Sequence, residues 1–275
     1  MMMKWRFLAL IIMACSFTGC IDIFETFNIK DDGSGVYEQK MDFTRAMQGM
    51  MAMMSEKGRD NMSSKKKMEK KDSTFSLKSM IDTASSLSSS EKTVFGKANA
   101  TMHLDEAKGE MVIIISYPFA NAAEFATIQA VMSRNETSGS LFDALMSAAD
   151  GKMKNKGMGG MGQEGDGSKK EGLPISQYMY SLSGNGISRK IKNPNDSSAA
   201  PKKNELDDMP EEMKKMMQEM MMMNITTIIN TPKPVKDFQG NNGTLSNDKK
   251  QIRFSKQVNL DTKLSSVDFD FNVNY

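Results

Sequence analysis

Apolar and polar residues alternate in several short runs, most regularly at the C-terminus. There Val267, Phe269, Phe271, Val273 and Tyr275 occupy every second position. A period of two is typical of a β-strand with one buried face. The sequence therefore predicts a terminal strand that pairs within a sheet.

Three further segments have the pattern of β-hairpins, in which apolar runs flank a turn rich in Asp, Asn or Gly. They are residues 21–43 around the cluster 31–35, residues 98–119 around the turn 105–109, and residues 178–191 around Gly184, Asn185 and Gly186. Residues 111–115 are continuously apolar. This run predicts a central strand buried on both faces.

Helical spacing replaces alternation in four other segments. They are residues 46–57, 75–87, 122–132 and 209–220. Asn121 and Glu124 resemble a capping box before the third of these helices. The first and last carry methionines at positions i, i+3, i+4 and i+7, which form one stripe on a helix. The stripes comprise Met47, Met50, Met51 and Met54, and then Met213, Met216, Met217 and Met220.

Polar and low-complexity stretches separate these elements. A Lys-rich stretch near 58–73, a Gly- and Met-rich stretch near 133–175 and a polar stretch near 192–204 predict flexible inserts. Residues 20–275 are thus expected to form a single α+β domain. We predict a mostly antiparallel sheet built from hairpins, with amphipathic, Met-rich helices packed on it.

The first twenty residues have the three parts of a secretory signal. Lys4 and Arg6 precede the apolar run 7–15, and small or polar residues lead to Cys20. The run is shorter than the roughly 20 apolar residues that a membrane span needs. Residues 17–20 read Phe-Thr-Gly-Cys and resemble a bacterial lipobox, which implies cleavage after residue 19 and acylation of Cys20. Cys15 is a rival site, but the apolar run before it is too short.

Composition narrows the function classes that remain. The chain has 36 basic and 34 acidic residues, and loss of Lys4 and Arg6 with the signal leaves a net charge of zero. This balance does not favour a nucleic-acid partner. Cys15 also leaves with the signal, so an acylated Cys20 excludes a disulfide. Stability must then come from packing alone.

No catalytic motif stands out along the chain. Neither HExxH nor GxSxG occurs, and the glycines at 162 and 167 are followed by Ser-Lys rather than the Lys-Ser of a P-loop. His103 is the only histidine and lies next to a predicted turn, where it is expected to be a strand residue rather than a ligand. We therefore predict a non-enzymatic protein without a cofactor or metal.

The 29 methionines allow three interpretations. They form adaptable core, they line a pliable groove for acyl chains or a partner helix, or they bind copper(I) through thioethers. The helical phase of the two stripes favours core first, groove second and copper third.

The hairpin turn at 31–35, the Met-rich helix and the segment Pro232-Lys233-Pro234-Val235 before the last strands carry a resemblance. The layout over residues 21–132 and 177–275 resembles lipoproteins common in Bacteroidota and, more remotely, the LppM-type α+β domain of mycobacterial lipoproteins. That resemblance implies binding of lipid-like ligands at the cell envelope.

The expected function is that of a membrane-anchored envelope lipoprotein. Its domain is expected to bind lipid or another envelope protein, and its bilayer anchor is the acylated Cys20. The expected location is the outer membrane of a Gram-negative bacterium. The alternative hypothesis is a Met-rich periplasmic copper(I)-binding protein.

Overall fold

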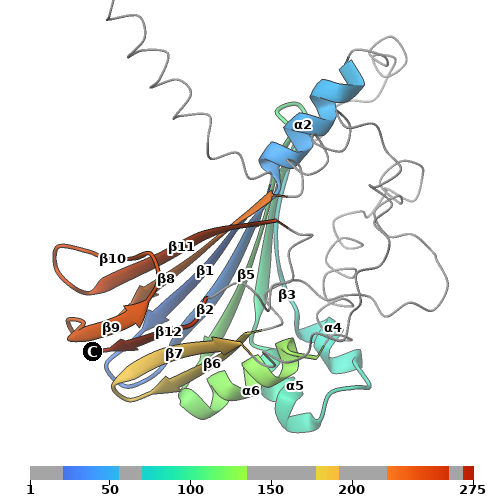
Figure 1. Ribbon diagram of the computed structural model, residues 1–275. Coiled ribbons are helices and arrows are strands. Elements are labelled where there is room, and N and C mark those ends of the chain that lie inside the picture. Colours follow the sequence, from blue (N-terminus) through green and yellow to red (C-terminus); the bar gives the residue numbers. More distant parts are fainter. Residues whose placement is uncertain (1–20, 56–69, 135–177, 192–221, 260–268) are drawn as a thin grey trace, which may run out of the picture.

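An eight-stranded sheet and a four-stranded sheet form the framework of the described residues (Figure 1). The computed structural model describes residues 21–55, 70–134, 178–191, 222–259 and 269–275. The large sheet has the order β10-β11-β8-β1-β2-β5-β4-β3, and the small sheet has the order β6-β7-β12-β9. The fold is of the α+β class, as predicted.

The large sheet is antiparallel except for one pair, β1 and β8, which run parallel with Ile23 opposite Ile225. Its strands are β1 (Ile21–Ile29), β2 (Gly35–Asp42), β3 (Lys70–Ser76), β4 (Asn99–Asp105), β5 (Glu110–Phe119), β8 (Met222–Asn230), β10 (Gly243–Leu245) and β11 (Gln251–Asn259). The predicted hairpins 21–43 and 98–119 are β1–β2 and β4–β5. Both are confirmed.

The small sheet is entirely antiparallel and contains the third predicted hairpin as β6–β7. Its strands are β6 (Tyr178–Ser183), β7 (Gly186–Ile191), β9 (Asp237–Gly240) and β12 (Phe271–Asn274). The predicted terminal strand is β12, which lies between β7 and β9. Phe269, Phe271, Val273 and Tyr275 are all buried, as their alternation predicted.

The core lies between one face of the large sheet and a layer made of the small sheet and α6 (Ala122–Met132). The ring of Phe27 stacks on Tyr37 at 4.7 Å and lies 5.0 Å from Tyr180 of β6. Phe254 of β11 stacks on Phe271 of β12 at 4.8 Å. The inward apolar side chains of β1, β2, β5 and β11 are therefore buried against the second layer, which removes their apolar surface from water.

Two helix starts show how local sequence positions this layer. Asn121 accepts a hydrogen bond from the backbone N–H of Glu124 and caps α6, which confirms the predicted start. The Glu124 carboxylate accepts from the N–H of Ala120 instead of completing a capping box. A complete capping box, formed by Ser88 and Glu91, starts α5 (Ser89–Phe95).

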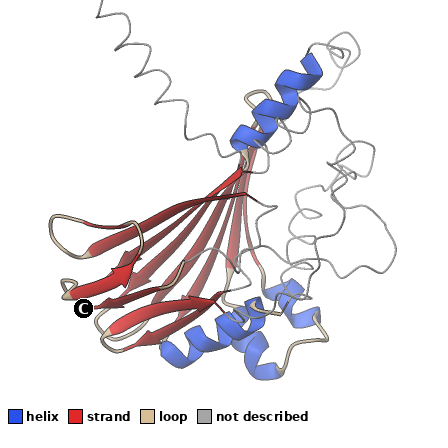
Figure 2. Cartoon of the chain, in the orientation of Figure 1, coloured by secondary structure: helices blue, strands red, loops and turns tan. Residues whose placement is uncertain are grey.

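Helices occupy opposite ends of the large sheet. Figure 2 shows α5, α6 and α4 (Lys78–Thr83) grouped at one end, while α2 (Thr44–Ser55) lies at the other. The first predicted Met-rich segment is therefore helical, but it projects from the sheet end rather than covering a face. The second segment, 209–220, lies outside the described residues. Met222 and Met223, at the end of its methionine run, begin strand β8.

Three details differ from the sequence prediction. Residues 70–76 form the edge strand β3 where the end of an insert and the start of a helix were expected. The helix predicted over 75–87 is shorter, because α4 begins at Lys78 and ends at Thr83. The ladder with β4 fixes this strand although Phe75 is its only large apolar residue. Of the other predicted inserts, 192–204 lies outside the described residues, and so does 133–175 except for Ser133, which caps α6, and Arg134.

The third difference concerns the run 111–115 in β5. Met111, Ile113 and Ile115 are buried, whereas Val112 and Ile114 are half-buried on the opposite face. That face carries polar neighbours such as Lys40 and Thr101, which lie directly opposite Ile114. The strand therefore has one buried face, not two.

The turn between β1 and β2 generates a stability prediction. A Cβ at Gly35 would lie 2.3 Å from the carbonyl oxygen of Asn28 and 2.6 Å from the ring of Phe119. We expect Gly35→Ala to lower the free energy of unfolding by about 2–3 kcal/mol, because neither the strand nor the buried ring can give way. Gly184→Ala is the control, since nothing lies within 4 Å of its Cβ position. Equal stability of the two variants in urea unfolding would contradict this packing.

Candidate functional site

A buried ion pair links the two sheets. Glu25 of β1 and Arg189 of β7 are each 1% exposed, and Nη1 of Arg189 lies 3.4 Å from Oε2 of Glu25. Burying a charge in this way costs several kcal/mol unless the charge is paired and its remaining hydrogen-bonding positions are occupied. The surrounding hydrogen bonds therefore decide whether the pair is a reactive centre or a structural one.

The carboxylate of Glu25 accepts three further hydrogen bonds. The hydroxyl of Tyr37 donates to Oε1 at 2.7 Å, and the hydroxyls of Tyr180 and Thr227 donate to Oε2 at 2.6 and 3.2 Å. Burial first, and the Glu25 charge second, raises the pKa of both tyrosines well above 10.0. Both phenols therefore keep their protons at neutral pH and act as donors.

The guanidinium of Arg189 also has several hydrogen-bond acceptors besides Glu25. Its Nε donates to the carbonyl oxygen of Phe269 at 2.7 Å, and its Nη1 donates to Oγ1 of Thr227 at 2.8 Å. Its carbon also lies 4.4 Å from the ring centre of Phe269 and 4.7 Å from that of Phe271, within the range of a cation–π contact. These contacts compensate the charge of Arg189 from several sides.

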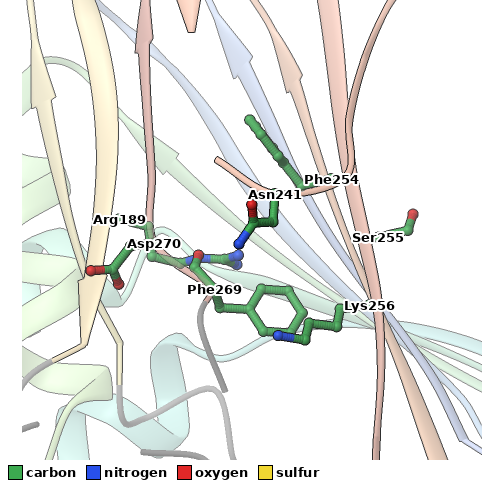
Figure 3. Close-up of a pocket in the computed structure, with 7 residues that line it drawn as sticks. All are labelled: Arg189, Asn241, Phe254, Ser255, Lys256, Phe269 and Asp270. Carbon is green, nitrogen blue, oxygen red and sulfur yellow. The ribbon is translucent and has the colours of Figure 1, made fainter. Parts of the chain in front are cut away.

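A small pocket opens beside this pair (Figure 3). It is lined by Arg189, Asn241, Phe254, Ser255, Lys256, Phe269 and Asp270, and its volume is about 10 Å³. The chain of Lys256 runs along the ring of Phe269, while the hydroxyl of Ser255 points away from the other side chains. This volume suits about one water molecule and is far too small for an acyl chain. Glu25, Arg189 and their hydrogen-bond partners thus form a buried cluster that joins the two sheets.

His103 lies on the opposite, half-exposed face of the large sheet. Its Nδ1 is hydrogen-bonded to Asp72 of β3, and its Nε2 lies 3.4 Å from Glu110 of β5. The two carboxylates contact opposite ring nitrogens, so they do not converge on one point where a metal ion could bind. Within the described ranges, no group of three His, Cys, Asp or Glu residues is arranged to hold a metal. His103 is a strand residue, as expected.

Most of the residues predicted from sequence as a site lie outside the described residues. These are Cys20, Met213, Met216, Met217 and Met220. Met50 and Met54 belong to α2, but their side chains are not described. Met47 is half-buried against the core and Met51 is 36% exposed. These positions do not decide whether the methionines form core, line a groove or bind copper(I). All three interpretations stay predictions.

Sequence reasoning missed Glu25 and Arg189, although each left a signal. Glu25 interrupts the inward series Ile23, Phe27 and Ile29 of a clear alternating strand. An ionisable residue at an inward position requires a partner in the core. No local pattern identifies that partner as Arg189, which is 164 residues away.

Comparisons with known proteins find a distant structural neighbour. No family model and no curated protein matches the chain. The chain is similar to the folded domain of LppM from Mycobacterium tuberculosis, solved by NMR, with a TM-score of 0.33 and 7% sequence identity. The match covers 94% of this chain and 91% of that one. No conclusion about family or function is drawn from this match, and the expected resemblance to Bacteroidota lipoproteins and to the LppM-type domain stays a prediction.

The buried pair generates a stability prediction. We expect Arg189→Met to lower the free energy of unfolding by about 3–5 kcal/mol, because it leaves the Glu25 charge buried without a cation. Glu25→Leu leaves Arg189 unpaired and should cost a similar amount. The double variant should lose much less than the sum of the two, since no lone charge remains.

Urea unfolding measures this cycle, and Lys190→Met on the exposed face of β7 is the control, with an effect within about 0.5 kcal/mol. Tyr180→Phe, which removes one donor to Glu25, is a milder test, with a cost of about 1–3 kcal/mol. Additive losses in the double variant would show that the pair is not coupled.

His103 generates a pH prediction. Its hydrogen bond to Asp72 first, and that to Glu110 second, raises the pKa of His103 above 6.5. A raised pKa means that the stabilisation is fully present below the ordinary pKa and is lost as the pH rises through the folded one. We expect the Tm difference between the unmodified protein and His103→Gln to be larger at about pH 5.5 than at about pH 9.

The size of this difference is modest, because the His103 side chain is 34% exposed and water screens the pair. Thr101→Ala, on the same strand and without a titrating group, is the control and should show no such pH dependence. A His103→Gln difference that is constant or grows with pH would refute the assignment.

Proposed function

We propose that this protein is a membrane-anchored lipoprotein of the cell envelope, held by an acylated Cys20. Its folded part serves as a non-enzymatic binding or scaffolding module for lipid or for another envelope protein. The proposed location is the outer membrane of a Gram-negative bacterium. The bilayer is the first partner, through the acyl chains on Cys20.

The start of the first strand carries the proposal. The lipobox-like residues 17–20 end at Cys20, and β1 begins at the next residue, Ile21. β1 lies inside the large sheet, between β2 and β8. An anchor at Cys20 is therefore joined to a central strand without a linker, so that the membrane fixes one end of the sheet.

The buried polar cluster of the described residues joins the two sheets, and the binding role is proposed for other parts of the folded chain. Glu25, Arg189, Tyr37 and Tyr180 satisfy one another in the core, and the pocket beside them has room for about one water molecule. An acyl chain or peptide would have to bind at a surface or among residues outside the described ranges. Of the helices in the described ranges, none has the length and apolarity to cross a bilayer.

Acyl labelling tests the proposal. We expect the protein made in a Gram-negative host to incorporate labelled palmitate and to float with membranes, because two or three acyl chains bind a bilayer durably. Cys20→Ala should lose the label and the cleavage after residue 19. Cys15→Ala is the matched control and should keep both. An unlabelled product, or a Cys20→Ala form that is still cleaved and still labelled, would overturn the anchor.

Native mass spectrometry of the product released from membranes then identifies what the folded part binds. A copurifying lipid or envelope protein is the expected result. A domain that carries neither at native abundance would contradict the binding role while leaving the anchor intact.

A further inference from the structure

One end of the large sheet brings together segments that are far apart in the sequence. Ile21 starts β1 opposite Met223 of β8, and Asp22 pairs with Asp42 at the end of β2. Asp42 in turn pairs with Val112, next to the β4–β5 turn at residues 105–110. We call this row the anchor end, because the residue before Ile21 is Cys20.

Helix α2 rises from the anchor end and projects beyond the strands (Figure 1). Its base is fixed by several contacts. The N–H of Thr44 donates to Asp42 at 3.1 Å, and the hydroxyl of Thr44 accepts from the N–H of Met111 at 3.3 Å. Arg45 lies 3.8 Å from Asp22, two residues after Cys20. The helix is therefore held in a set direction relative to the point of attachment.

The β4–β5 turn supports α2 from the side. Gln48 Nε2 donates to the carbonyl oxygen of Lys108 at 3.1 Å. Gly109 has a φ of 63°, and a Cβ at this position would lie 2.9 Å from Sδ of Met51. The turn thus approaches the helix closely at its second turn, which stiffens the helix where it leaves the sheet.

The composition of α2 differs from that of a solvated surface helix. Its sequence, TRAMQGMMAMMS, has five methionines and one charged residue, Arg45. Met51 is 36% exposed although it is large and apolar. A water-exposed helix of twelve residues is ordinarily stabilised by charged pairs on its outer face. With five methionines in its sequence and Arg45, Gln48 and Met51 exposed, α2 combines apolar and polar groups, as a helix at the boundary between lipid headgroups and acyl chains does.

We propose that α2 lies in the interfacial region of the bilayer that holds Cys20, with the exposed side chain of Met51 in contact with lipid. This inference rests on the proposed function, because the anchor places the helix at the membrane. The occupant of the exposed Met51 surface is lipid, and the inserted helix fixes the tilt of the sheet relative to the membrane. Acyl chains at Cys20 alone fix where the sheet begins but leave its tilt free.

A pair of single-cysteine probes tests the inference. In the processed protein Cys20 is blocked by its acyl group, so that Met51→Cys introduces one reactive thiol. Met179→Cys is the matched control, because Met179 of β6 is 51% exposed but lies in the small sheet. Each variant is labelled with an environment-sensitive fluorophore and reconstituted in vesicles of phosphatidylethanolamine and phosphatidylglycerol.

We expect the probe at position 51 to shift to shorter wavelength and to lose most of its emission when the vesicles contain doxyl-labelled lipids. The probe at position 179 should show neither change. Emission from position 51 that matches position 179 would overturn the inference. A wavelength shift without quenching by doxyl lipid would also overturn it, since it indicates a protein contact.

The anchor is scored separately by the intact mass of the same samples. If the product carries no acyl chains, the proposed function fails. The probe variants are then made with Cys15→Ser and Cys20→Ser, so that the labelled thiol stays unique, and the unacylated protein is mixed with the same vesicles in excess. Quenching at position 51 but not at 179 would then still support an interfacial α2. Its absence would contradict the inference irrespective of the anchor.

Discussion

The two sheets depend on one charged contact that is almost completely shielded from solvent. Glu25 and Arg189 come from different sheets, and each is almost fully buried. The pair is tolerable only because Tyr37, Tyr180, Thr227 and the carbonyl oxygen of Phe269 satisfy the remaining polar positions. A displacement of the small sheet would break these bonds together, so the pair restricts the core to one arrangement of the sheets.

This arrangement also fixes the first described strand, β1, rigidly relative to the rest of the two sheets. Glu25 lies on β1 only a few residues after Cys20, and the same strand pairs with β2 and β8 over its length. An anchor at Cys20 would therefore be joined directly to the rigid sheet and not through a flexible linker. α2 lies at that end and the small sheet lies toward the other, so the two ends of the large sheet face different surroundings in the proposed orientation (Figure 1).

Local patterns predicted most of the elements, whereas long-range partners could not be predicted. The alternation from Phe269 to Tyr275 and the cap at Asn121 depend on neighbours within a few residues, and both are confirmed. β3 was missed because a ladder with β4 creates it, not its own apolar residues. The parallel pairing of β1 with β8, in which Glu25 faces Thr227, joins segments 202 residues apart. The division into two sheets and the choice of Arg189 as the partner of Glu25 follow from such contacts.

The attachment of the sheet to the membrane without a spacer is the central claim, and neutron reflectometry on a supported bilayer tests it most directly. β1 has nine residues, which corresponds to about 30 Å of extended strand. The account predicts that protein density begins within the headgroup layer and continues without a water-filled gap, with a thickness of at least about this length. A hydrated layer between the headgroups and the protein, or a protein that washes off the bilayer, would contradict it.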